Sequence, residues 1–311
     1  MKNVDDKKKF YSVCPVCGGA HQQWRVKQSG NDVWPIDQCT VCGFAFANPR
    51  PSIDFLMNFY QNTGHASQVG SVVAKVESLE TVVEREKLEP NSSIDAKRVL
   101  DTLTTITGLK EGDSSDSVVK HFLDVGCGYG FFSKAAQSRG YQVTSIELAK
   151  TERAIATQML GVQPIASSFE AFSGESGKFS VVLMSQILEH ALDFNDWIVK
   201  AKGLLKENGH LVIALPNFGS IFRYLMQERE PYICPPAHIN FFNTRSLSVL
   251  LQKHGFQVVE RQWITRIPKS ALRSRFGDLM GTSLVPFSKI AASAIDSSHL
   301  GMMINIYAQK V

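Results

Sequence analysis

The stretch His121-Phe-Leu-Asp-Val-Gly-Cys-Gly-Tyr-Gly-Phe-Phe132 decides the fold of this chain. Apolar residues, several of them β-branched, run from Val118 to Val125 and predict a buried strand. Three glycines at alternate positions follow at once, and residues 131–139 are then expected to form a helix closed by Gly140. A strand, a glycine turn and a helix make the first half of a nucleotide-binding βαβ unit, in which the glycines let the backbone approach a ligand closely.

The glycine spacing and two nearby carboxylates indicate the kind of nucleotide. A dinucleotide site has the spacing Gly-x-Gly-x-x-Gly, whereas this chain has Gly-x-Gly-x-Gly and Phe131 at the third position. Asp124 ends the first strand, where it would face a cationic group. Glu147 ends the next predicted strand, residues 141–147, where a carboxylate can accept hydrogen bonds from both ribose hydroxyls. The set favours a ligand with a ribose and an ammonium group but no pyrophosphate.

Two motifs then carry a family resemblance. Leu123-Asp-Val-Gly-Cys-Gly-Tyr-Gly130 resembles motif I of the class I S-adenosylmethionine (SAM) methyltransferases, and Ser145-Ile-Glu-Leu148 resembles their second-strand motif. The resemblance implies a Rossmann-like α/β fold with a seven-stranded sheet and SAM as cofactor. A βαβ turn without a ligand and an NAD site are the alternatives, and the agreement of two motifs in order and spacing favours SAM. The implied cofactor contacts from these motifs are Asp124, Gly126, Cys127, Gly128, Glu147 and Leu148, with Cys127 a small filler of the turn.

Length and composition limit the remaining possibilities. With 311 residues, 44% of them hydrophobic, the chain can bury one substantial core and a small satellite domain. A formal net charge of +4 is too small to argue for nucleic acid. No stretch approaches about 18 consecutive apolar residues, and the first residues are too charged for a signal peptide. We therefore expect a soluble, cytoplasmic protein with no membrane partner.

Four of the six cysteines form two matched pairs near the N-terminus. Cys14-Pro-Val-Cys17-Gly is followed, after 21 residues, by Cys39-Thr-Val-Cys42-Gly. Each pair can place two thiolates on one ion, and the glycine after it permits a tight turn. Residues 1–50 are thus predicted to form a zinc ribbon with a closed, structural Zn²⁺ site. Unligated cysteines or a redox pair are the alternatives, and His21 is not needed as a ligand.

The rest of the chain divides into a helical segment and the SAM domain. Residues 51–117 are expected to form a helical cap and linker, and residues 118–311 the SAM-binding domain. The run from Cys39 through Asn48-Pro-Arg-Pro51 to Phe59-Tyr60 resembles the start of methyltransferases with a zinc-binding domain ahead of the SAM domain. Many of those enzymes act on sugars or natural products. Further strands are expected at residues 162–166, 179–184, 211–215, 256–265 and 303–309, the last returning between its neighbours.

Two positions depart from the family pattern. After the third strand the family usually has an acidic residue that contacts the adenine amine, and this chain has Ser168 and Phe169 there. A serine hydroxyl or a backbone carbonyl could substitute, with Phe169 packing on the adenine ring. The fourth strand runs into Ser185-Gln186, with Ser180 in place of the usual acidic residue. Because ligands lie outside the carboxyl ends of the strands, Ser185 and Gln186 are expected beside the cofactor.

The acceptor site is expected after the fifth strand. Residues 217–243 are rich in aromatics and prolines and are predicted to form a substrate lid. His190 and His238 are the candidate general bases, because an imidazole titrates near neutral pH and can take a proton from an acceptor hydroxyl. Tyr232 is a candidate for orienting the acceptor. The alternative for His190 is a bond to backbone at a helix start, and for His238 a hydrogen bond that orders its loop.

Together these observations predict SAM-dependent methyl transfer to a small-molecule acceptor, most simply an oxygen of a sugar or related metabolite. One rival is an RNA methyltransferase that grips RNA with the zinc ribbon, which the low charge disfavours. The other is a catalytically silent SAM-binding or scaffold protein, which the two altered positions keep open. The sequence identifies neither the acceptor nor the oligomeric state.

Overall fold

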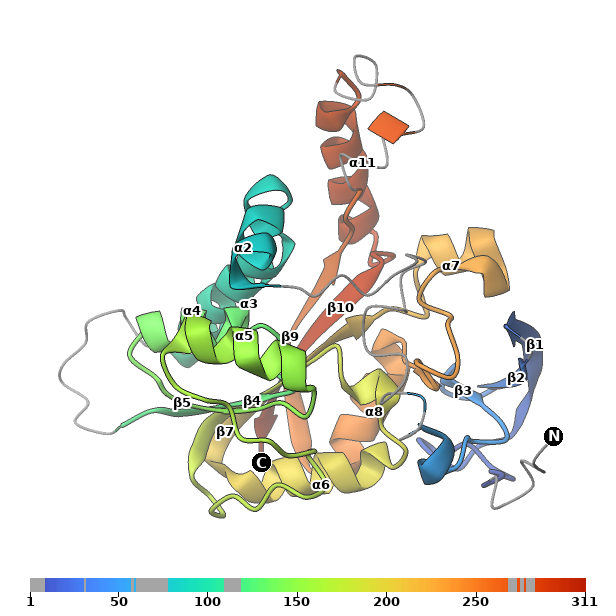
Figure 1. The fold of residues 1–311 in the computed structure, drawn as a ribbon. Helices are drawn as coiled ribbons and strands as arrows, with labels where there is room; N and C mark the ends of the chain where they lie inside the picture. The colour runs from blue at the N-terminus through green and yellow to red at the C-terminus, as the bar shows by residue number, and fades with distance from the viewer. Residues whose placement is uncertain are drawn as a thin grey trace. The chain divides into compact units, whose positions relative to one another are not determined.

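A computed structural model describes residues 9–30, 32–56, 59, 78–108, 119–267, 273–274, 277 and 283–311. The chain divides into two compact units, shown as a ribbon in Figure 1. The first unit comprises Met1–Ile53, Ala214–Leu250 and Arg261–Ile306. The second comprises Asp54–Ile213, Leu251–Glu260 and Tyr307–Val311. The chain therefore passes between the units several times, and each is described by itself.

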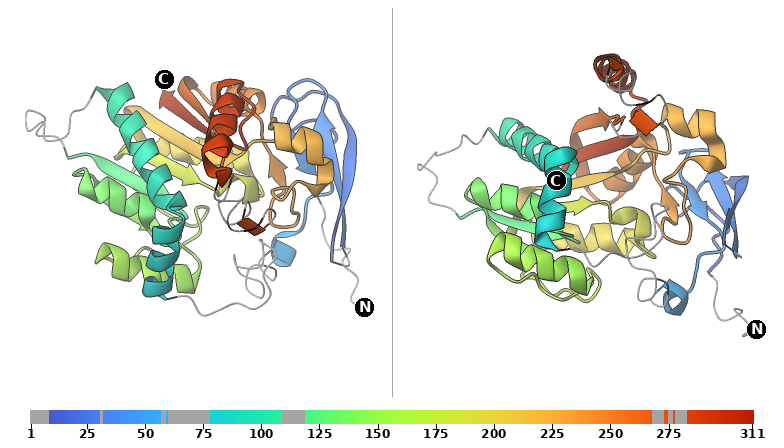
Figure 2. Two further views of the ribbon diagram at one scale, coloured as in Figure 1. Left: turned by 90° about the horizontal axis from the view of Figure 1, so that it is seen from above. Right: turned by 45° about the horizontal axis from the view of Figure 1, so that its top comes forward.

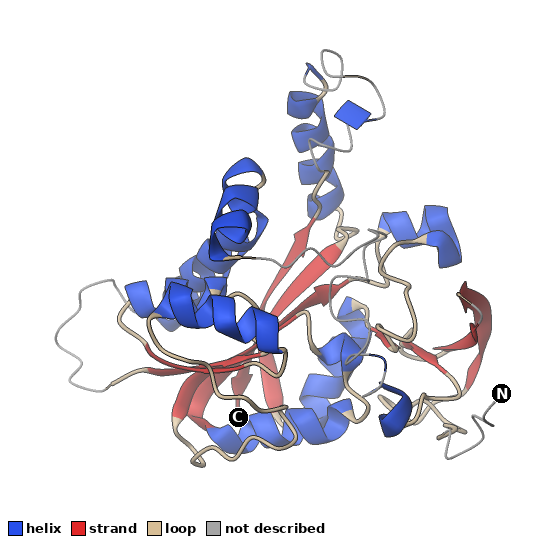
Figure 3. Cartoon of the chain, in the orientation of Figure 1, coloured by secondary structure: helices blue, strands red, loops and turns tan. Residues whose placement is uncertain are grey.

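A mixed sheet forms the framework of the SAM domain, in the order β5-β4-β6-β7-β10-β9. Strands β4 and β5 pair in parallel, as do β4 and β6. Strand β10 lies between β7 and β9, which confirms the predicted return of the last strand. The Rossmann-like α/β class is confirmed, and Figure 3 shows the strands with helices on both faces. The strand bounds are β4 His121–Val125, β5 Gln142–Ile146, β6 Phe179–Ser185, β7 Leu205–Pro216, β9 Phe256–Ile264 and β10 Met303–Lys310.

The strand expected at residues 162–166 is reduced to a single bridge. Ile165 pairs in parallel with Ile146, donating its backbone N–H to Ser145 at 2.9 Å and accepting from Glu147 at 3.0 Å. Pro164 precedes it and has no N–H, so a ladder cannot continue through that residue. The described sheet thus has six strands and one bridge where seven strands were expected.

The helices of the second unit cover both faces of its strands. Helices α3 (Asn91–Thr107), α4 (Phe131–Ser138) and α5 (Lys150–Leu160) lie on one face, and α6 (Phe194–Leu204) lies on the other (Figure 3). Helix α2 (Leu79–Leu88) precedes α3 and begins with a capping box at Ser78. Helix α3 lies in the segment 51–117 that was expected to be a cap, yet its apolar residues pack into the hydrophobic core against the sheet. That core contains Val99, Leu100, Leu103, Phe122, Ala136, Val181, Leu183, Val212 and Tyr307.

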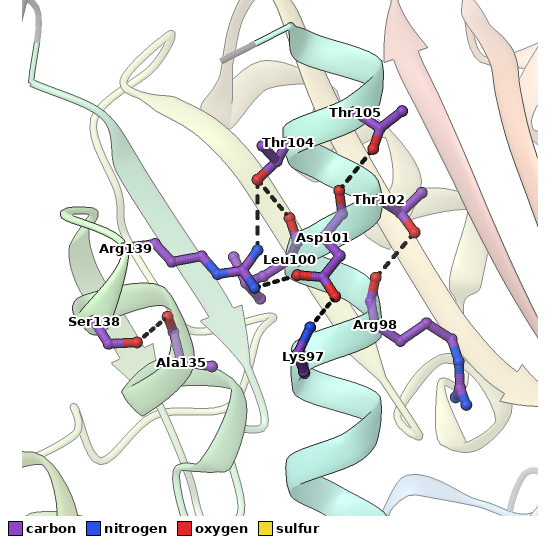
Figure 4. Close-up of polar contacts among 10 residues, drawn as sticks. All are labelled: Lys97, Arg98, Leu100, Asp101, Thr102, Thr104, Thr105, Ala135, Ser138 and Arg139. Carbon is purple, nitrogen blue, oxygen red and sulfur yellow. Dashed lines mark hydrogen bonds and ion pairs between the residues drawn. The ribbon is translucent and has the colours of Figure 1, made fainter. Parts of the chain in front are cut away.

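Polar contacts fix α3 against the end of α4 (Figure 4). Arg139, which follows α4, forms an ion pair with Asp101 and donates a hydrogen bond to Thr104 at 3.5 Å. Lys97 donates to the same carboxylate from one turn earlier, at 2.6 Å. Hydrogen bonds from Lys97 and Arg139 hold the pKa of Asp101 below its usual value. Pairs this close to solvent contribute little stability, but they orient α3 relative to the helix that follows the glycine loop.

The first unit is built on a small antiparallel sheet in the order β1-β2-β3-β8. The ribbon supplies β1 (His21–Ser29), β2 (Asp32–Cys39) and β3 (Ala45–Ala47), and the paired β1 and β2 are visible in Figure 2. Strand β8 (Asn240–Phe241) comes from the insertion after β7, and its Phe241 pairs with Ala45. The ribbon and the insertion, which were expected to be separate modules, therefore share one sheet.

Aromatic residues from both segments form the core of the first unit. Phe218 packs edge-on against Trp24 with ring centroids 5.0 Å apart, and Phe242 lies 4.7 Å from Phe44. Arg50 is 1% exposed and donates to the carbonyl of Ile239 at 2.8 Å. Several aromatics of residues 217–243 thus serve as core residues. The other elements of this part are α7 Ile221–Met226, η3 Gln227–Arg229, α8 Thr244–Lys253 and α11 Val285–Ser297.

Candidate functional site

The glycine loop joins β4 to α4 at the carboxyl edge of the sheet. Gly126, Gly128 and Gly130 have φ values of +67°, +53° and +90°, a region that favours glycine. A Cβ on Gly126 would lie 2.3 Å from Cδ1 of Ile187, in the loop after β6. The ends of β4 and β6 therefore meet at this loop, so Ser185 is brought to the edge where the sequence places the cofactor.

Glu147 braces the same loop from the end of β5. One carboxylate oxygen accepts from the N–H of Gly128 at 2.9 Å, and the other accepts from Ala149 at 2.8 Å. Arg153 donates to the carbonyls of Glu147 and Leu148, both at 3.0 Å. A carboxylate has about four acceptor positions. Two remain after these bonds, so the preoriented side chain keeps the capacity to accept from two ribose hydroxyls.

Asp124 lies beneath the loop in a buried polar network that the sequence did not reveal. It is 1% exposed and accepts from the Ser133 hydroxyl at 2.6 Å, while the Ser133 and Ser145 hydroxyls are 2.7 Å apart. Burial raises the pKa of Asp124 to about 6, opposed by the Ser133 hydrogen bond and reinforced by the charge of Glu147. Two neighbouring carboxylates repel a pyrophosphate and favour a cationic ligand. The only sequence signal for Ser133 was its place in the first turn of α4.

The remaining predicted cofactor residues occupy different environments. Ser168 caps a turn by accepting from the N–H of Ala171 at 3.3 Å. Phe169 is 2% exposed and packs edge-on against Trp197 with centroids 5.3 Å apart. The adenine contact expected of these two residues stays a prediction. Leu148 is 54% exposed, and Gln186 is exposed with a φ of +55°.

Cys127 lies inside the turn as a small apolar residue. It is 8% exposed and belongs to a cluster with Ala156 and Leu160 of α5. Burial and the charges of Asp124 and Glu147 raise the pKa of this thiol. A thiol held protonated is a poor nucleophile, which fits the predicted role as filler.

Helix α2 reaches the glycine loop from the segment expected to be a cap. The guanidinium of Arg85 lies 5.7 Å from the ring centroid of Tyr129, between Gly128 and Gly130. Both residues belong to the second unit. The contact gives α2 a place beside the predicted cofactor position.

The four ribbon cysteines converge on one point in the first unit. Their sulfurs all lie within 4.8 Å of one another, with Cys14 to Cys42 at 3.7 Å and Cys17 to Cys39 at 3.5 Å. A tetrahedral ion with Zn–S bonds of about 2.3 Å requires sulfurs about 3.8 Å apart. The chain's own geometry therefore fits a four-thiolate zinc site.

The backbone of the second knuckle also points at sulfur. The N–H groups of Val41 and Cys42 donate to the Cys39 sulfur at 3.3 and 3.4 Å. Gly43 has a φ of +74°, which the turn requires. His21 is engaged elsewhere, with Nδ1 3.0 Å from Asp37 and Nε2 3.0 Å from the carbonyl of Tyr11. Both ring nitrogens of His21 therefore have partners other than the cysteine sulfurs.

The two candidate bases belong to different units. His238 is 6% exposed, its Nδ1 lies 2.8 Å from the carbonyl of Tyr232, and the two rings are nearly parallel with centroids 6.3 Å apart. Because a carbonyl only accepts, Nδ1 carries the hydrogen, and Nε2 is the basic nitrogen of the neutral ring. His190 ends the short helix η2 (Leu188–His190), and its backbone N–H donates to Ile187 at 3.1 Å.

Comparisons with known proteins agree with this geometry. A family model described as "Methyltransferase domain" matches residues 96–261. The "Ubiquinone biosynthesis O-methyltransferase" of Pelagibacter ubique is 32% identical over 172 residues, covering 48% of this chain and 72% of that protein. The protein of the same name from Bartonella tribocorum is 25% identical over 174 residues, or 50% and 68%. For that from Coxiella burnetii the match spans 32% of this chain and 44% of the relative.

Two solved structures resemble almost the whole chain. Burkholderia thailandensis 1,6-didemethyltoxoflavin-N1-methyltransferase, with S-adenosylhomocysteine bound, has a TM-score of 0.51 and 14% identity and covers 93% of this chain and 100% of that one. Haemonchus contortus phosphoethanolamine N-methyltransferase 2 has a TM-score of 0.51 and 16% identity and covers 92% and 70%. At these identities the likeness shows the fold.

The glycine loop, the two carboxylates and the fold define a SAM-dependent methyltransferase of class I. The chain belongs to the methyltransferase-domain family, with a cluster of four cysteines at its N-terminus. In the described part of the chain, every helix is too short or too polar to cross a bilayer.

Proposed function

We propose that this enzyme methylates an oxygen of a small metabolite, with a sugar or related compound as the acceptor. The pair formed by Asp124 and Glu147 beneath the glycine loop carries the cofactor part of the proposal. The name O-methyltransferase shared by the curated relatives supports oxygen as the acceptor atom. The resemblance of the N-terminal segment to sugar and natural-product methyltransferases supports the sugar.

When bound, SAM supplies a methyl group on a positively charged sulfur. Glu147 would hold the ribose hydroxyls, and Asp124 would face the ammonium directly or through water. Transfer of that methyl group to an acceptor hydroxyl would leave one proton to be removed, so a basic group of the chain has to lie near the acceptor oxygen. Positioning of the two reactants supplies most of the acceleration. The chain must therefore align the acceptor and provide a place for one proton.

His238 is the preferred base for that proton, and His190 is the second candidate. The hydrogen bond from Nδ1 to the Tyr232 carbonyl orients the ring and makes Nε2 the nitrogen that would take the acceptor's proton. The near-parallel Tyr232 ring would help to orient the acceptor or the imidazole. Phe218 and Phe241 pack in the core and so do not face an acceptor. The proposed role of residues 217–243 as a substrate lid therefore rests on His238 and Tyr232.

Binding and kinetics test the proposal in two steps. Calorimetry should show binding of SAM and S-adenosylhomocysteine but not of NAD. Glu147→Ala should weaken SAM binding at least about tenfold, as expected when hydrogen bonds to a charged group are lost. Glu152→Ala, in the first turn of α5, is the matched control. Unchanged affinity in Glu147→Ala would show that the ribose assignment is wrong.

The base is tested once an acceptor turns over. Removing a general base costs about 10²–10⁴-fold in rate, so kcat of His238→Ala should fall by that factor while SAM affinity stays the same. His190→Ala is measured in parallel, and His254→Ala, whose ring contacts Asn195, serves as control. Near-normal rates in both the His190 and His238 variants would leave positioning alone as the mechanism.

The ribbon is proposed to hold one structural zinc ion through Cys14, Cys17, Cys39 and Cys42. The sulfur spacing supports this assignment. Absence of zinc from protein purified without chelators would contradict it. Thiols in this arrangement belong in a reducing compartment, which supports a cytoplasmic location.

A further inference from the structure

A pocket of about 530 Å³ lies beside the second cysteine knuckle, entirely within the first unit. Its wall combines residues of the knuckle with Gly219, Arg223 and Tyr224 from the insertion and Asn243 and Arg245 at the start of α8. Two arginines face this one space, and among its described lining residues no aspartate or glutamate balances them. The pocket is therefore a concentrated positive site.

Arg223 is held rigidly in the wall. The side chain is 6% exposed, and its Nε donates to the carbonyl of Phe218 at 2.6 Å. The guanidinium carbon lies 3.7 Å from the ring centroid of Tyr224 and 4.5 Å from that of Phe218. Burial lowers the pKa of Arg223, and the adjacent Tyr224 opposes that change. Aromatic stacking thus orients the planar fork and partly offsets the cost of burying its charge.

The donors of Arg223 exceed its partners. A guanidinium has five N–H donors; one is used by the Phe218 carbonyl and another interacts with the side chain of Tyr224. Within the described residues no carboxylate forms an ion pair with Arg223 or with the exposed Arg245. A buried cation is costly to fold unless a negative charge lies near it, and no described carboxylate supplies one to Arg223, so an anionic ligand would do so.

A second depression in the same unit provides a contrast. It has a volume of about 570 Å³ and also contains two arginines, Arg25 and Arg229. Glu228 lies in its wall, with a carboxylate oxygen 3.6 Å from Nε of Arg25. The charge of that depression is therefore partly neutralised by the chain itself, unlike the charge of the knuckle pocket.

We propose that the knuckle pocket binds the phosphate group of a phosphorylated small molecule, with Arg223 and Arg245 as its cationic ligands. Arginine forks match phosphate oxygens in pairs and are the preferred donors for such groups. The volume exceeds what a phosphate alone needs and leaves room for an attached organic group. Asn243 holds the wall in place by donating to the carbonyl of Gly43 at 2.9 Å.

A competing explanation assigns the arginines to the metal. Zn²⁺ with four thiolates carries a net charge of −2, and Cys39 and Cys42 also line the pocket. The two explanations predict different losses when an arginine is removed: the proposal predicts loss of phosphate binding, and the competing one predicts loss of zinc.

Calorimetry on the zinc-loaded full chain distinguishes phosphate binding by the arginines from a role at the metal. The probes are inorganic pyrophosphate, phenyl phosphate and malonate. Both phosphates should bind and compete, and malonate should bind at least about tenfold more weakly because it lacks a tetrahedral group. Arg245→Gln should weaken pyrophosphate binding at least about tenfold, and the exposed Arg229→Gln should change it less than about twofold. SAM affinity should be the same in all three proteins, so the result is independent of the proposed methyl acceptor.

Three results would each overturn the proposal. One is that the unaltered chain binds no phosphate. Another is that Arg245→Gln and Arg229→Gln lose pyrophosphate affinity equally, and the third is that malonate binds as tightly as pyrophosphate. Faster loss of zinc to a chelator in Arg245→Gln, with phosphate binding intact, would assign the arginines to the metal. Single-stranded RNA that displaces pyrophosphate at far lower concentration would make this a nucleic-acid site.

Arg223→Lys tests the fork itself, because lysine keeps the charge and loses the planar pair of donors. The expected result is weaker pyrophosphate binding with normal zinc content. A folded Arg223→Lys protein that binds like the unaltered chain would refute the role of the fork. If that variant does not fold, the comparison of pyrophosphate binding by Arg245→Gln and by Arg229→Gln still decides the proposal.

Discussion

Replacing Asp124 by asparagine should make stability respond to pH in a defined way. The pKa of this buried carboxyl rises from 3.8 to about 6 in the folded chain. Each pKa unit corresponds to about 1.36 kcal/mol, so a shift of roughly two units is worth about 3 kcal/mol. Because the folded-state pKa is raised above the unfolded value, the carboxyl's stabilising contribution is fully present below pH 3.8 and is lost as the pH rises through about 6.

Asparagine has nearly the same shape but does not titrate. The Ser133 hydroxyl can still donate to its oxygen, while its amide nitrogen needs a new acceptor and adds a constant cost of about 1–3 kcal/mol if none is found. The constant part cancels when two pH values are compared. Asp124→Asn should therefore gain roughly 2.4 kcal/mol on the unaltered chain between about pH 4 and about pH 8, because at pH 4 about 0.6 of the roughly 3 kcal/mol is already lost.

Urea unfolding of both proteins at the two pH values measures this difference. Ser133→Ala provides the opposite perturbation: it removes a hydrogen bond that favours the ionised carboxylate, and so should enlarge the pH dependence of the chain that keeps Asp124. A difference near zero, or a loss in Asp124→Asn at high pH, would refute the raised pKa. Near pH 6, SAM binding should also release protons from the unaltered chain and not from Asp124→Asn, measured by calorimetry in buffers of different ionisation enthalpy.

Three further changes have expected outcomes. Gly126→Arg should abolish SAM binding by calorimetry, because φ is +67° and a Cβ already meets Ile187; retained binding would place the cofactor elsewhere. Cys39→Ser should lower zinc content and Tm much more than SAM affinity, and hydrogen exchange should then lose protection in β3 and β8 while β4 keeps it. Arg50→Ala should cost about 1–3 kcal/mol in urea unfolding, because it removes a buried, charged donor to the carbonyl of Ile239, which then keeps only the N–H of Ala47; an unchanged midpoint would contradict that.

Features that depend on a few neighbouring residues could be predicted from the sequence. The glycine loop and the two cysteine knuckles are short motifs whose spacing fixes their local geometry: the three loop glycines have positive φ and the four sulfurs converge. The cofactor role of Glu147, which accepts from Gly128, stays a prediction. The strand at residues 162–166 was overestimated, because Pro164 limits it to one bridge. Ser133 was missed because a serine in a first helical turn has no periodic signal. Its hydrogen bond to Asp124 exists only once α4 packs on β4.

Pairing between distant segments could not be predicted for the ribbon. Strands β3 and β8 have three and two residues, too few for an alternating pattern, and their partners are almost 200 residues apart in the chain. Nothing in the separate segments indicated that Ala45 would pair with Phe241. The aromatic content of residues 217–243 was therefore interpreted as a binding surface, although Phe218, Phe241 and Phe242 mainly fill the core.

The shared sheet couples the four-cysteine cluster to the segment that carries His238. Asn243 donates to the carbonyl of Gly43 directly after the second knuckle, and Lys27 of β1 donates to the carbonyl of Glu228 at 2.6 Å. Phe44, two residues after Cys42, packs against Phe242. A ribbon that loses its metal would lose the sheet to which residues 240–243 attach, because a small four-thiolate module depends on its ion for folding. The proposed zinc site would thus support the proposed acceptor side of the enzyme from within the same unit, without taking part in the chemistry.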